Sequence, residues 1–199
     1  MVKFSDSMFV PYNERGWQER TVRRVRGVTV MDELFFSILR SPFGPLTVVA
    51  GERGLRAVHI GEPGTLDGAL RGAVESGPRH TSLAAPCSQL REYLAGTRTR
   101  FDLRLDLRGT PFQVEVWKSL RRVPYGRTAS YADQARSIGR PTAVRAVGSA
   151  NGRNPVPIVL PCHRIVASDG TLGGYSGGLR VKEWLLAHEQ CGKKGAPRS

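Results

Sequence analysis

The amino-acid sequence predicts an α/β protein of the α+β type, with a β-rich N-terminal half followed by a mainly helical C-terminal half. Two observations support this prediction. Between residues 34 and 60, short apolar runs are separated by turns rich in Gly and Pro, which is typical of a β-meander. After Gly109, apolar residues recur at helical spacing instead. The chain has 199 residues, enough for one large domain or two small ones.

Residues 31–109 are expected to form the first domain. Strands are predicted at 34–39, 46–50 and 55–60, separated by turns that contain Gly. A helix is predicted at 82–94 and should end near Gly96. Residues 101–107 alternate apolar and charged side chains, as a half-exposed strand does.

Residues 110–192 are expected to form a second, helical domain. Thr110 and Pro111 are favourable starting residues for a helix that should run to Leu120. Two short helices are predicted at 128–138 and 142–150, and such a pair forms a helix-turn-helix. Many unrelated helical hairpins share this pattern, so DNA binding and a plain hairpin both remain open. An amphipathic helix is also predicted at 181–189.

The positive charge is concentrated in the second half of the chain. The formal net charge is +13, and residues 111–199 carry 14 Lys and Arg against 5 Asp and Glu. A concentrated positive charge favours nucleic-acid binding, because neutralising phosphates releases counterions. The alternative is a basic surface that faces only solvent.

Composition excludes several classes of protein. The sequence contains nothing close to the roughly 20 consecutive apolar residues that span a bilayer, and it lacks the pattern of a secretory signal. Three cysteines are too few for a disulfide framework, and no pair has metal-finger spacing. We therefore expect a soluble, cytoplasmic protein. Residues 1–30 are expected to be a poorly ordered basic extension, with Met31 as an alternative start, and 193–199 a flexible tail.

The sequence around Cys162 indicates a reactive thiol. Residues 156–160 are apolar and flanked by Pro, which predicts a buried strand that presents Cys162 and His163 at its end. A free thiol has a pKa of about 8.5 and needs a base or a positive field to become nucleophilic. His163 is the candidate base. Because neighbouring strand residues face opposite sides, the pair needs a turn or a bridging water, and we expect a water relay.

Two further residues could complete this group. Glu189 lies at the edge of the apolar face of helix 181–189 and could point inward to orient His163. The alternative is an exposed carboxylate near the helix end. Asn154 could hydrogen-bond the sulfur or simply open a turn before Pro155. The Gly-rich segment 173–178 is either a plain connector or a loop whose backbone can approach a flat ligand.

These motifs resemble those of the O6-alkylguanine-DNA alkyltransferases, also called methylated-DNA–protein-cysteine methyltransferases. The active-site signature of that family is Pro-Cys-His-Arg, found here at 161–164, with Asn-Pro-Val-Pro at 154–157 and Tyr-Ser-Gly-Gly at 175–178 in register. The similarity covers about residues 110–190. It includes Thr-Pro-Phe at 110–112, Pro-Tyr-Gly at 124–126, Ser-Tyr at 130–131 and Arg-Ala-Val-Gly at 145–148. Ser-Pro-Phe-Gly-Pro at 41–45 resembles the family's more variable N-terminal domain.

The resemblance implies a ribonuclease H-like α/β roll followed by a winged helix-turn-helix-like domain that carries the reactive cysteine. It implies DNA repair by direct reversal, in which an alkyl group passes irreversibly from O6-alkylguanine, or O4-alkylthymine, to Cys162. Each molecule then acts once, without a cofactor. The implied catalytic residues are Cys162, His163, Glu189 and Asn154. The implied base-binding residues are Tyr131, which donates to N3 of guanine, Tyr175, and Ser176 through its backbone N–H.

The resemblance also implies how DNA is bound. The damaged base is flipped out of the duplex, Arg145 fills the vacated stack, and the helix-turn-helix occupies the minor groove. The other implied DNA contacts are Ala132, Arg140 and Ser168. We expect a monomer with no membrane partner that can bind DNA cooperatively, on the nucleoid if the cell is bacterial. Some relatives hold zinc through N-terminal Cys and His; with no cysteine before Cys87, we expect no metal here.

Two other functions fit parts of the sequence. A helix-turn-helix regulator of DNA would use Cys162 as a sensor, or simply bury it as a small side chain. A Cys-His hydrolase would use the same thiol as a nucleophile, but it would leave the basic half and the helix-turn-helix unexplained.

Overall fold

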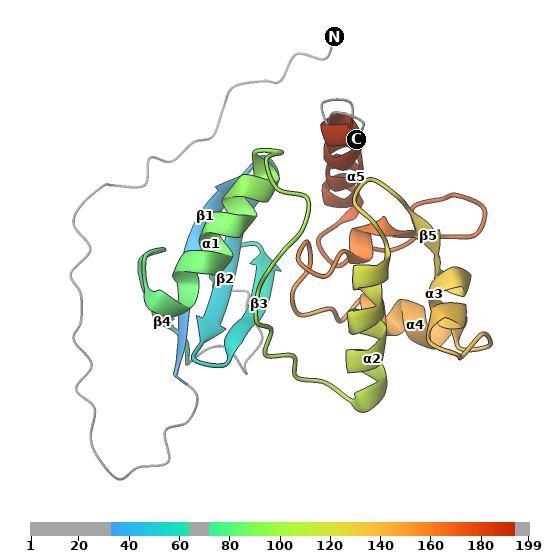
Figure 1. The fold of residues 1–199 in the computed structure, drawn as a ribbon, viewed down its shortest axis with the longest axis horizontal. Helices are drawn as coiled ribbons and strands as arrows, with labels where there is room; N and C mark the ends of the chain where they lie inside the picture. The colour runs from blue at the N-terminus through green and yellow to red at the C-terminus, as the bar shows by residue number, and fades with distance from the viewer. Residues whose placement is uncertain (1–32, 64–71, 194–199) are drawn as a thin grey trace.

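The N-terminal half, up to residue 109, contains the predicted β-meander. The computed structural model describes residues 33–63 and 72–193, so the extension expected at 1–30 and the tail residues 194–199 lie outside the described residues. Strands β1 (Leu34–Ser41), β2 (Gly44–Gly51) and β3 (Gly54–Ile60) pair antiparallel in sequence order. Strand β4 (Val74–Glu75) pairs parallel with β1, which gives the order β3-β2-β1-β4 (Figure 1).

Helix α1 (Thr81–Leu94) covers one face of this sheet (Figure 1). His80 caps the helix, because its Nδ1 accepts a hydrogen bond from the Ser82 backbone N–H. Leu83 and Leu90 are fully buried in the same core as Val48 of the sheet. The predicted strands of the meander and the predicted helix are therefore confirmed.

Residues 101–107 do not form the predicted strand. In the described part of the chain they are extended but make a single β-bridge, between Leu105 and Leu55 of β3. Further along the same edge, the Val58 N–H donates to the Pro155 carbonyl at 2.9 Å. The C-terminal half thus occupies the sheet edge along which a longer strand would have paired.

The described part of the C-terminal half is mainly helical. Its α-helices are α2 (Pro111–Ser119), α3 (Tyr131–Ser137), α4 (Val144–Asn151) and α5 (Leu179–Lys193). Its shorter elements are the 3-10 helices η3 (Leu120–Arg122) and η4 (Cys162–Arg164) and the parallel pair β5 (Ala129–Ser130) and β6 (Ile165–Val166). Helix α5 ends one residue into the expected tail.

Helices α3 and α4 form the predicted helix-turn-helix. The first helix was predicted from 128 but begins at Tyr131, because Ser130 is its N-cap and accepts the Asp133 N–H. The residues just before it pair with β6 instead. Gly139 takes a φ of 71° in the turn, a conformation that glycine adopts without strain. Both helices pack against α2 around a small core that includes Val147.

The strand predicted at 156–160 is wrong, although these residues are buried. They form a tight loop in which the Leu160 N–H donates to the Val156 carbonyl at 2.9 Å. Ile158 has a φ of 74°, which a β-branched residue rarely adopts. Asn154 holds the loop: its Oδ1 accepts the Val156 N–H at 3.1 Å, and its Nδ2 donates to the Leu160 carbonyl at 2.7 Å. Pro157 and the flanking Pro155 and Pro161 lack the N–H that strand pairing requires, so a side chain takes the place of a neighbouring strand.

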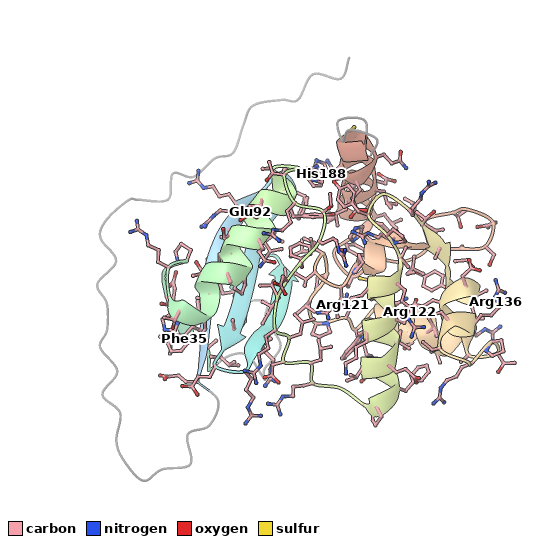
Figure 2. All side chains as sticks on the ribbon, in the orientation of Figure 1. Phe35, Glu92, Arg121, Arg122, Arg136 and His188 are labelled. Carbon is pink, nitrogen blue, oxygen red and sulfur yellow. The ribbon has the colours of Figure 1, made fainter. Side chains whose placement is uncertain are left out.

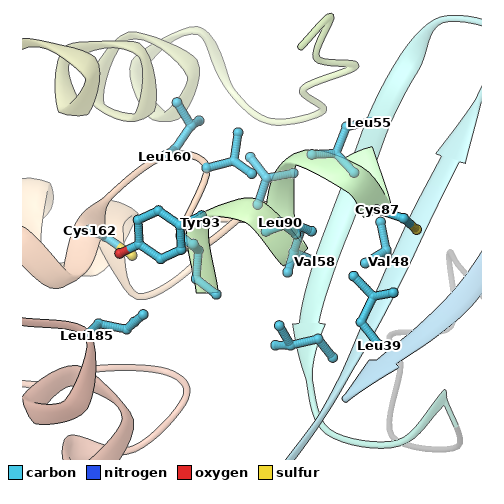
Figure 3. Close-up of a cluster of buried hydrophobic side chains, with 14 of the residues drawn as sticks. Leu39, Val48, Leu55, Val58, Cys87, Leu90, Tyr93, Leu160, Cys162 and Leu185 are labelled. Atoms are coloured by element: carbon cyan, nitrogen blue, oxygen red, sulfur yellow. The ribbon is translucent and has the colours of Figure 1, made fainter. Parts of the chain in front are cut away.

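One apolar core joins the two halves of the protein. Figure 3 shows Leu90 and Tyr93 of α1 in a cluster with Val48 of the sheet and with Leu160 and Leu185 of the C-terminal half. All five side chains are fully buried. The loop that precedes Cys162 is therefore held against the N-terminal half.

The helical half carries basic side chains on its surface. Arg121, Arg122 and Arg136 are exposed there (Figure 2). Among the described residues, no helix is both long and apolar enough to cross a membrane.

Gly109→Ala should destabilise the protein. A Cβ at this position would lie 2.6 Å from Cη2 of Trp117. That ring is 2% exposed and its Nε1 donates to the Ala150 carbonyl at 2.7 Å, so it cannot move aside easily. Overpacking of this kind costs about 1–3 kcal/mol, which urea denaturation followed by circular dichroism would measure. The control is Gly72→Ala, where a Cβ would meet nothing within 4 Å. Wild-type stability in both variants would contradict this packing.

Candidate active site

Cys162 lies in the wall of an open pocket. The chain turns after Pro161 into η4, which begins at the cysteine. Cys162 is 5% exposed and lines a pocket of about 380 Å³ together with Tyr131, Tyr175 and Ser176. The other lining residues are Gly148, Asn151, Gly152 and Gly174. The structure thus brings the expected nucleophile and the three expected base-binding residues to one pocket.

Asn154 connects the buried loop to the sulfur atom. Its Nδ2 donates to the Cys162 Sγ at 3.1 Å as well as to the Leu160 carbonyl. Burial raises the pKa of the Cys162 thiol to about 11, although the hydrogen bond from Asn154 favours the thiolate. A thiol with this pKa is almost entirely protonated near neutral pH, so it needs a base to act as a nucleophile.

His163 and Glu189 form a buried pair beside this thiol. The His163 Nε2 and the Glu189 Oε1 are 2.9 Å apart, and neither side chain is exposed. A carboxylate can only accept, so the imidazole proton lies on Nε2 and the lone pair on Nδ1. Nδ1 is buried and has no hydrogen-bond partner within the described residues. Burial lowers the pKa of His163, against the opposing effect of Glu189, so the ring is neutral near pH 7 and can accept a proton.

Glu189 is surrounded by hydrogen-bond donors. The Tyr93 O–H and the Gly126 N–H each donate to it at 2.7 Å. The Arg164 guanidinium donates at 2.9 to 3.2 Å, in addition to the contact with His163. Burial alone would raise the pKa of this carboxyl, but the hydrogen bonds from His163 and Arg164 outweigh it and lower the pKa to about 2. The carboxylate is therefore a buried anion and not an exposed group at the helix end.

The relation between Cys162 and His163 differs from the expectation for a strand. In the 3-10 helix η4, successive residues are about 120° apart and do not alternate between opposite faces. Both side chains are buried, which the turn of the chain permits. A water between Sγ and Nδ1 remains a prediction.

The two pocket tyrosines keep their protons. Burial raises the pKa of both Tyr131 and Tyr175. The Tyr131 O–H donates weakly to the Gly174 carbonyl at 3.5 Å, and the Tyr175 hydroxyl is buried without a partner among the described residues. Ser176 is exposed on the Gly-rich loop. Each hydroxyl is thus available as a donor to a polar group in the pocket.

The four expected DNA contacts do not line the pocket. Arg145 is exposed on α4, the helix that also supplies part of the pocket wall. Arg140 is exposed in the turn before α4, 3.5 Å from the carboxylate of Glu115. Ser168 is exposed after β6, and Ala132 is partly exposed on α3.

Sequence reasoning assigned no role to Lys182, Arg164 or Tyr93. Lys182 is fully buried on α5, and its Nζ donates to the carbonyls of Ile165, at 2.6 Å, and Leu172. Burial lowers the pKa of its ammonium group. Helical spacing could have identified it, because it lies seven residues before Glu189 on the inward face. Tyr93 gives no such local signal.

The described residues contain no evident metal site. Within 33–63 and 72–193, no three His, Cys, Asp or Glu side chains lie close enough to hold a metal ion. Cys87 and Cys162 are buried free thiols, and Cys191 is an exposed one.

Both halves of the chain match known protein families and sequences. The family model described as 6-O-methylguanine DNA methyltransferase, ribonuclease-like domain, matches residues 34–107, and the model of the corresponding DNA binding domain matches 111–191. The chain is 41% identical over 159 residues to the methylated-DNA–protein-cysteine methyltransferase of Methanosarcina barkeri, covering 79% of this chain and 98% of that one. A Mycobacterium tuberculosis protein of the same name is 44% identical over 168 residues, with 79% and 93% covered.

Solved structures of proteins with related names also match this chain. The crystal structure of Mycobacterium tuberculosis O6-methylguanine methyltransferase matches with a TM-score of 0.74 at 40% identity, covering 83% of this chain and 96% of that chain. The crystal structure of Mycobacterium tuberculosis OGT in complex with DNA matches with a TM-score of 0.71 at 40% identity, covering 79% and 94%.

The fold and the site define a protein with a ribonuclease-like α/β half and a helix-turn-helix half that carries a cysteine in a pocket. Because family models match both halves and relatives above 40% identity cover most of the chain, the chain belongs to the 6-O-methylguanine DNA methyltransferase family.

Glu189→Gln should lower stability in a pH-dependent way. Near neutral pH the variant leaves Arg164 without its buried counter-charge, which should cost about 3–5 kcal/mol. The folded-state pKa of the carboxyl lies near 2, below its ordinary value of 4.5, so its contribution is present above 4.5 and is lost as pH falls toward 2. The difference in unfolding free energy between wild type and variant should therefore shrink between about pH 7 and pH 3.

Denaturant titrations at the two pH values measure this difference. Glu183→Gln, an exposed change on the same helix, is the control and should match wild type at both. A difference between Glu189→Gln and wild type that stays constant with pH would contradict a buried, ionised carboxylate.

Proposed function

We propose that this protein repairs DNA by transferring the alkyl group of O6-alkylguanine to Cys162. The observation that carries the proposal is the placement of one thiol. Cys162 lines a pocket large enough for a flipped base, next to a neutral imidazole whose other nitrogen contacts a buried carboxylate. The named relatives and the family assignment point to the same reaction.

The relay Cys162–His163–Glu189 prepares the nucleophile. His163 accepts the thiol proton at Nδ1 through a water, and the resulting imidazolium is stabilised by Glu189. The hydrogen bond from Asn154 stabilises the thiolate as it forms. This arrangement overcomes the raised pKa of the buried thiol.

The transfer is a direct displacement at the alkyl carbon. The S–C bond forms as the C–O6 bond breaks, and the electron pair of that bond moves onto O6 and the guanine ring. Tyr131 donates a proton to N3, and the proton that His163 removed from the thiol returns through solvent to the phenol, so that neutral guanine, a neutral tyrosine and a neutral imidazole remain. Tyr175 and the backbone N–H of Ser176 complete the base pocket. The thioether is stable, so each molecule acts once; O4-alkylthymine is a second substrate of the same chemistry.

A stacked base cannot reach Cys162, so the damaged nucleotide must leave the duplex. Helix α4 supports a route for this, because it carries the exposed Arg145 and also borders the pocket. We propose that Arg145 fills the vacated stack from the minor groove, where readout depends little on sequence. Ala132, Arg140 and Ser168 contact the flanking DNA.

The protein acts as a monomer that can bind DNA cooperatively. A single chain supplies every residue of the relay and the pocket, which supports the monomer. The DNA substrate supports a cytoplasmic location, on the nucleoid in a bacterial cell. The chemistry as written uses no cofactor.

Cys162→Ala should abolish alkyl transfer. Wild-type protein incubated with a duplex carrying radiolabelled O6-methylguanine should gain up to one label per molecule, whereas the variant should gain none because the accepting sulfur is gone. Cys191→Ala, which removes an exposed thiol that does not line the pocket, is the control and should react as wild type. Repeated turnover, or no transfer by wild type, would favour a hydrolase or a DNA-binding regulator instead.

Arg145→Ala should impair repair of duplex DNA but spare the chemistry. Flipping a base costs a few kcal/mol, so losing the residue that fills the stack should slow repair about tenfold or more. Reaction with free O6-benzylguanine, which needs no flipping, should stay within about twofold of wild type. Arg104→Ala removes an exposed positive charge from the N-terminal half and is the control. Equal losses on both substrates would contradict the proposed role.

A further inference from the structure

We propose that Tyr93, from the N-terminal half, is a positioning residue of the alkyl-transfer relay, acting through Glu189 on His163. This inference rests on the proposed function. It assigns to the ribonuclease-like half a part in positioning the relay of the other half.

The first support is the geometry of the Tyr93 hydroxyl. It donates to Glu189 Oε1 at 2.7 Å, the same oxygen that faces His163 Nε2 at 2.9 Å, and it lies 3.5 Å from Nε2 itself. Tyr93 is fully buried, and Figure 3 shows its ring leaving α1 and pointing toward the region of Cys162. The hydroxyl therefore shares one acceptor oxygen with the base of the relay.

The second support is the rigidity of this tyrosine. Its carbonyl accepts a hydrogen bond from His188 Nε2 at 2.7 Å, so α5 holds the end of α1. Its ring packs against the rings of Phe101, His188 and Tyr125, with centroids 5.4, 5.4 and 6.1 Å away. With contacts from both halves, the phenol cannot turn away, and its O–H is a fixed donor.

Tyr93 affects the pKa of His163 through the negative charge on Glu189. A hydrogen bond from Tyr93 disperses the negative charge on Oε1 and keeps this oxygen aimed at Nε2. Without it, Oε1 attracts the imidazolium more strongly, which raises the pKa of His163 and protonates the base at a higher pH. The other charged or titratable groups near this pair and Tyr93 include Arg164 on η4, Lys182 and His188 on α5, Cys162, and Tyr125 in the loop before β5. A substitution of Tyr93 by Phe leaves all of these in place.

The test compares Tyr93→Phe with Tyr125→Phe in the full chain. The Tyr125 hydroxyl is buried but has no hydrogen-bond partner among the described residues, so its loss removes a matched hydroxyl and no hydrogen bond to Glu189. Rates of alkylation by free O6-benzylguanine are measured across pH. Tyr93→Phe should react about threefold to tenfold more slowly near neutral pH, and the acidic limb of its profile should move to higher pH. Tyr125→Phe should keep the wild-type rate and the wild-type position of the acidic limb.

A second readout does not depend on alkyl transfer. The pKa of His163, titrated through its ring-proton resonances, should rise in Tyr93→Phe and stay unchanged in Tyr125→Phe. If wild type transfers no alkyl group, the proposed function fails, while this titration still tests the link from Tyr93 to His163. If Tyr93→Phe leaves the alkylation rate, the acidic limb of the pH–rate profile and the pKa of His163 unchanged, the positioning role is overturned.

If Tyr93→Phe does not fold, a second variant with a smaller chemical change takes its place in the test. A ring-fluorinated tyrosine at position 93 keeps the ring and the hydroxyl but makes the O–H a stronger donor. The acidic limb and the His163 titration should then move to lower pH. No movement in either would overturn the proposal.

Discussion

The Glu189 carboxylate is ionised and has no exposed surface, so the fold must provide the donors that water would otherwise provide. These donors come from distant parts of the chain: Tyr93 at the end of α1, Gly126 in the loop before β5, and His163 and Arg164 in η4. A buried charge with its hydrogen bonds satisfied tolerates little displacement. Its position therefore links α1, α5 and η4, and with them the reactive cysteine at the start of η4.

Buried polar groups also hold the chain on both sides of that cysteine. Before it, Asn154 closes the loop in which Ile158 adopts a φ of 74°. After it, Lys182 donates from α5 to two backbone carbonyls that flank the following loop. Unusual backbone torsions and buried charges are costly, and they persist only where surrounding structure holds them in place. Here they fix a thiol that is shielded from bulk solvent yet open to a pocket.

Local patterns predicted most of the elements, because periodicity and caps act within a few residues. No strand forms at 156–160 because Pro157 and its flanking prolines cannot donate to a neighbouring strand and the Asn154 side chain bonds the backbone in its place, which apolar content alone does not reveal. The inward face of α5 made Glu189 a candidate, but its neighbours could not be deduced. Tyr93 lies 96 residues away, and only the contact between the end of α1 and α5 brings it there. Motifs and family resemblance thus predicted which residues gather around Cys162, while the donors that hold Glu189 in place required the structure.

The relay requires His163 to be neutral near pH 7, with its proton on Nε2 and its lone pair on Nδ1. Nitrogen-15 chemical shifts of the imidazole report both properties directly, and a His163→Gln variant assigns its signals among the four histidines. The expected spectrum shows a protonated Nε2 and an unprotonated Nδ1. A cationic ring near pH 7, or a proton on Nδ1, would contradict the role of His163 as the base that activates Cys162.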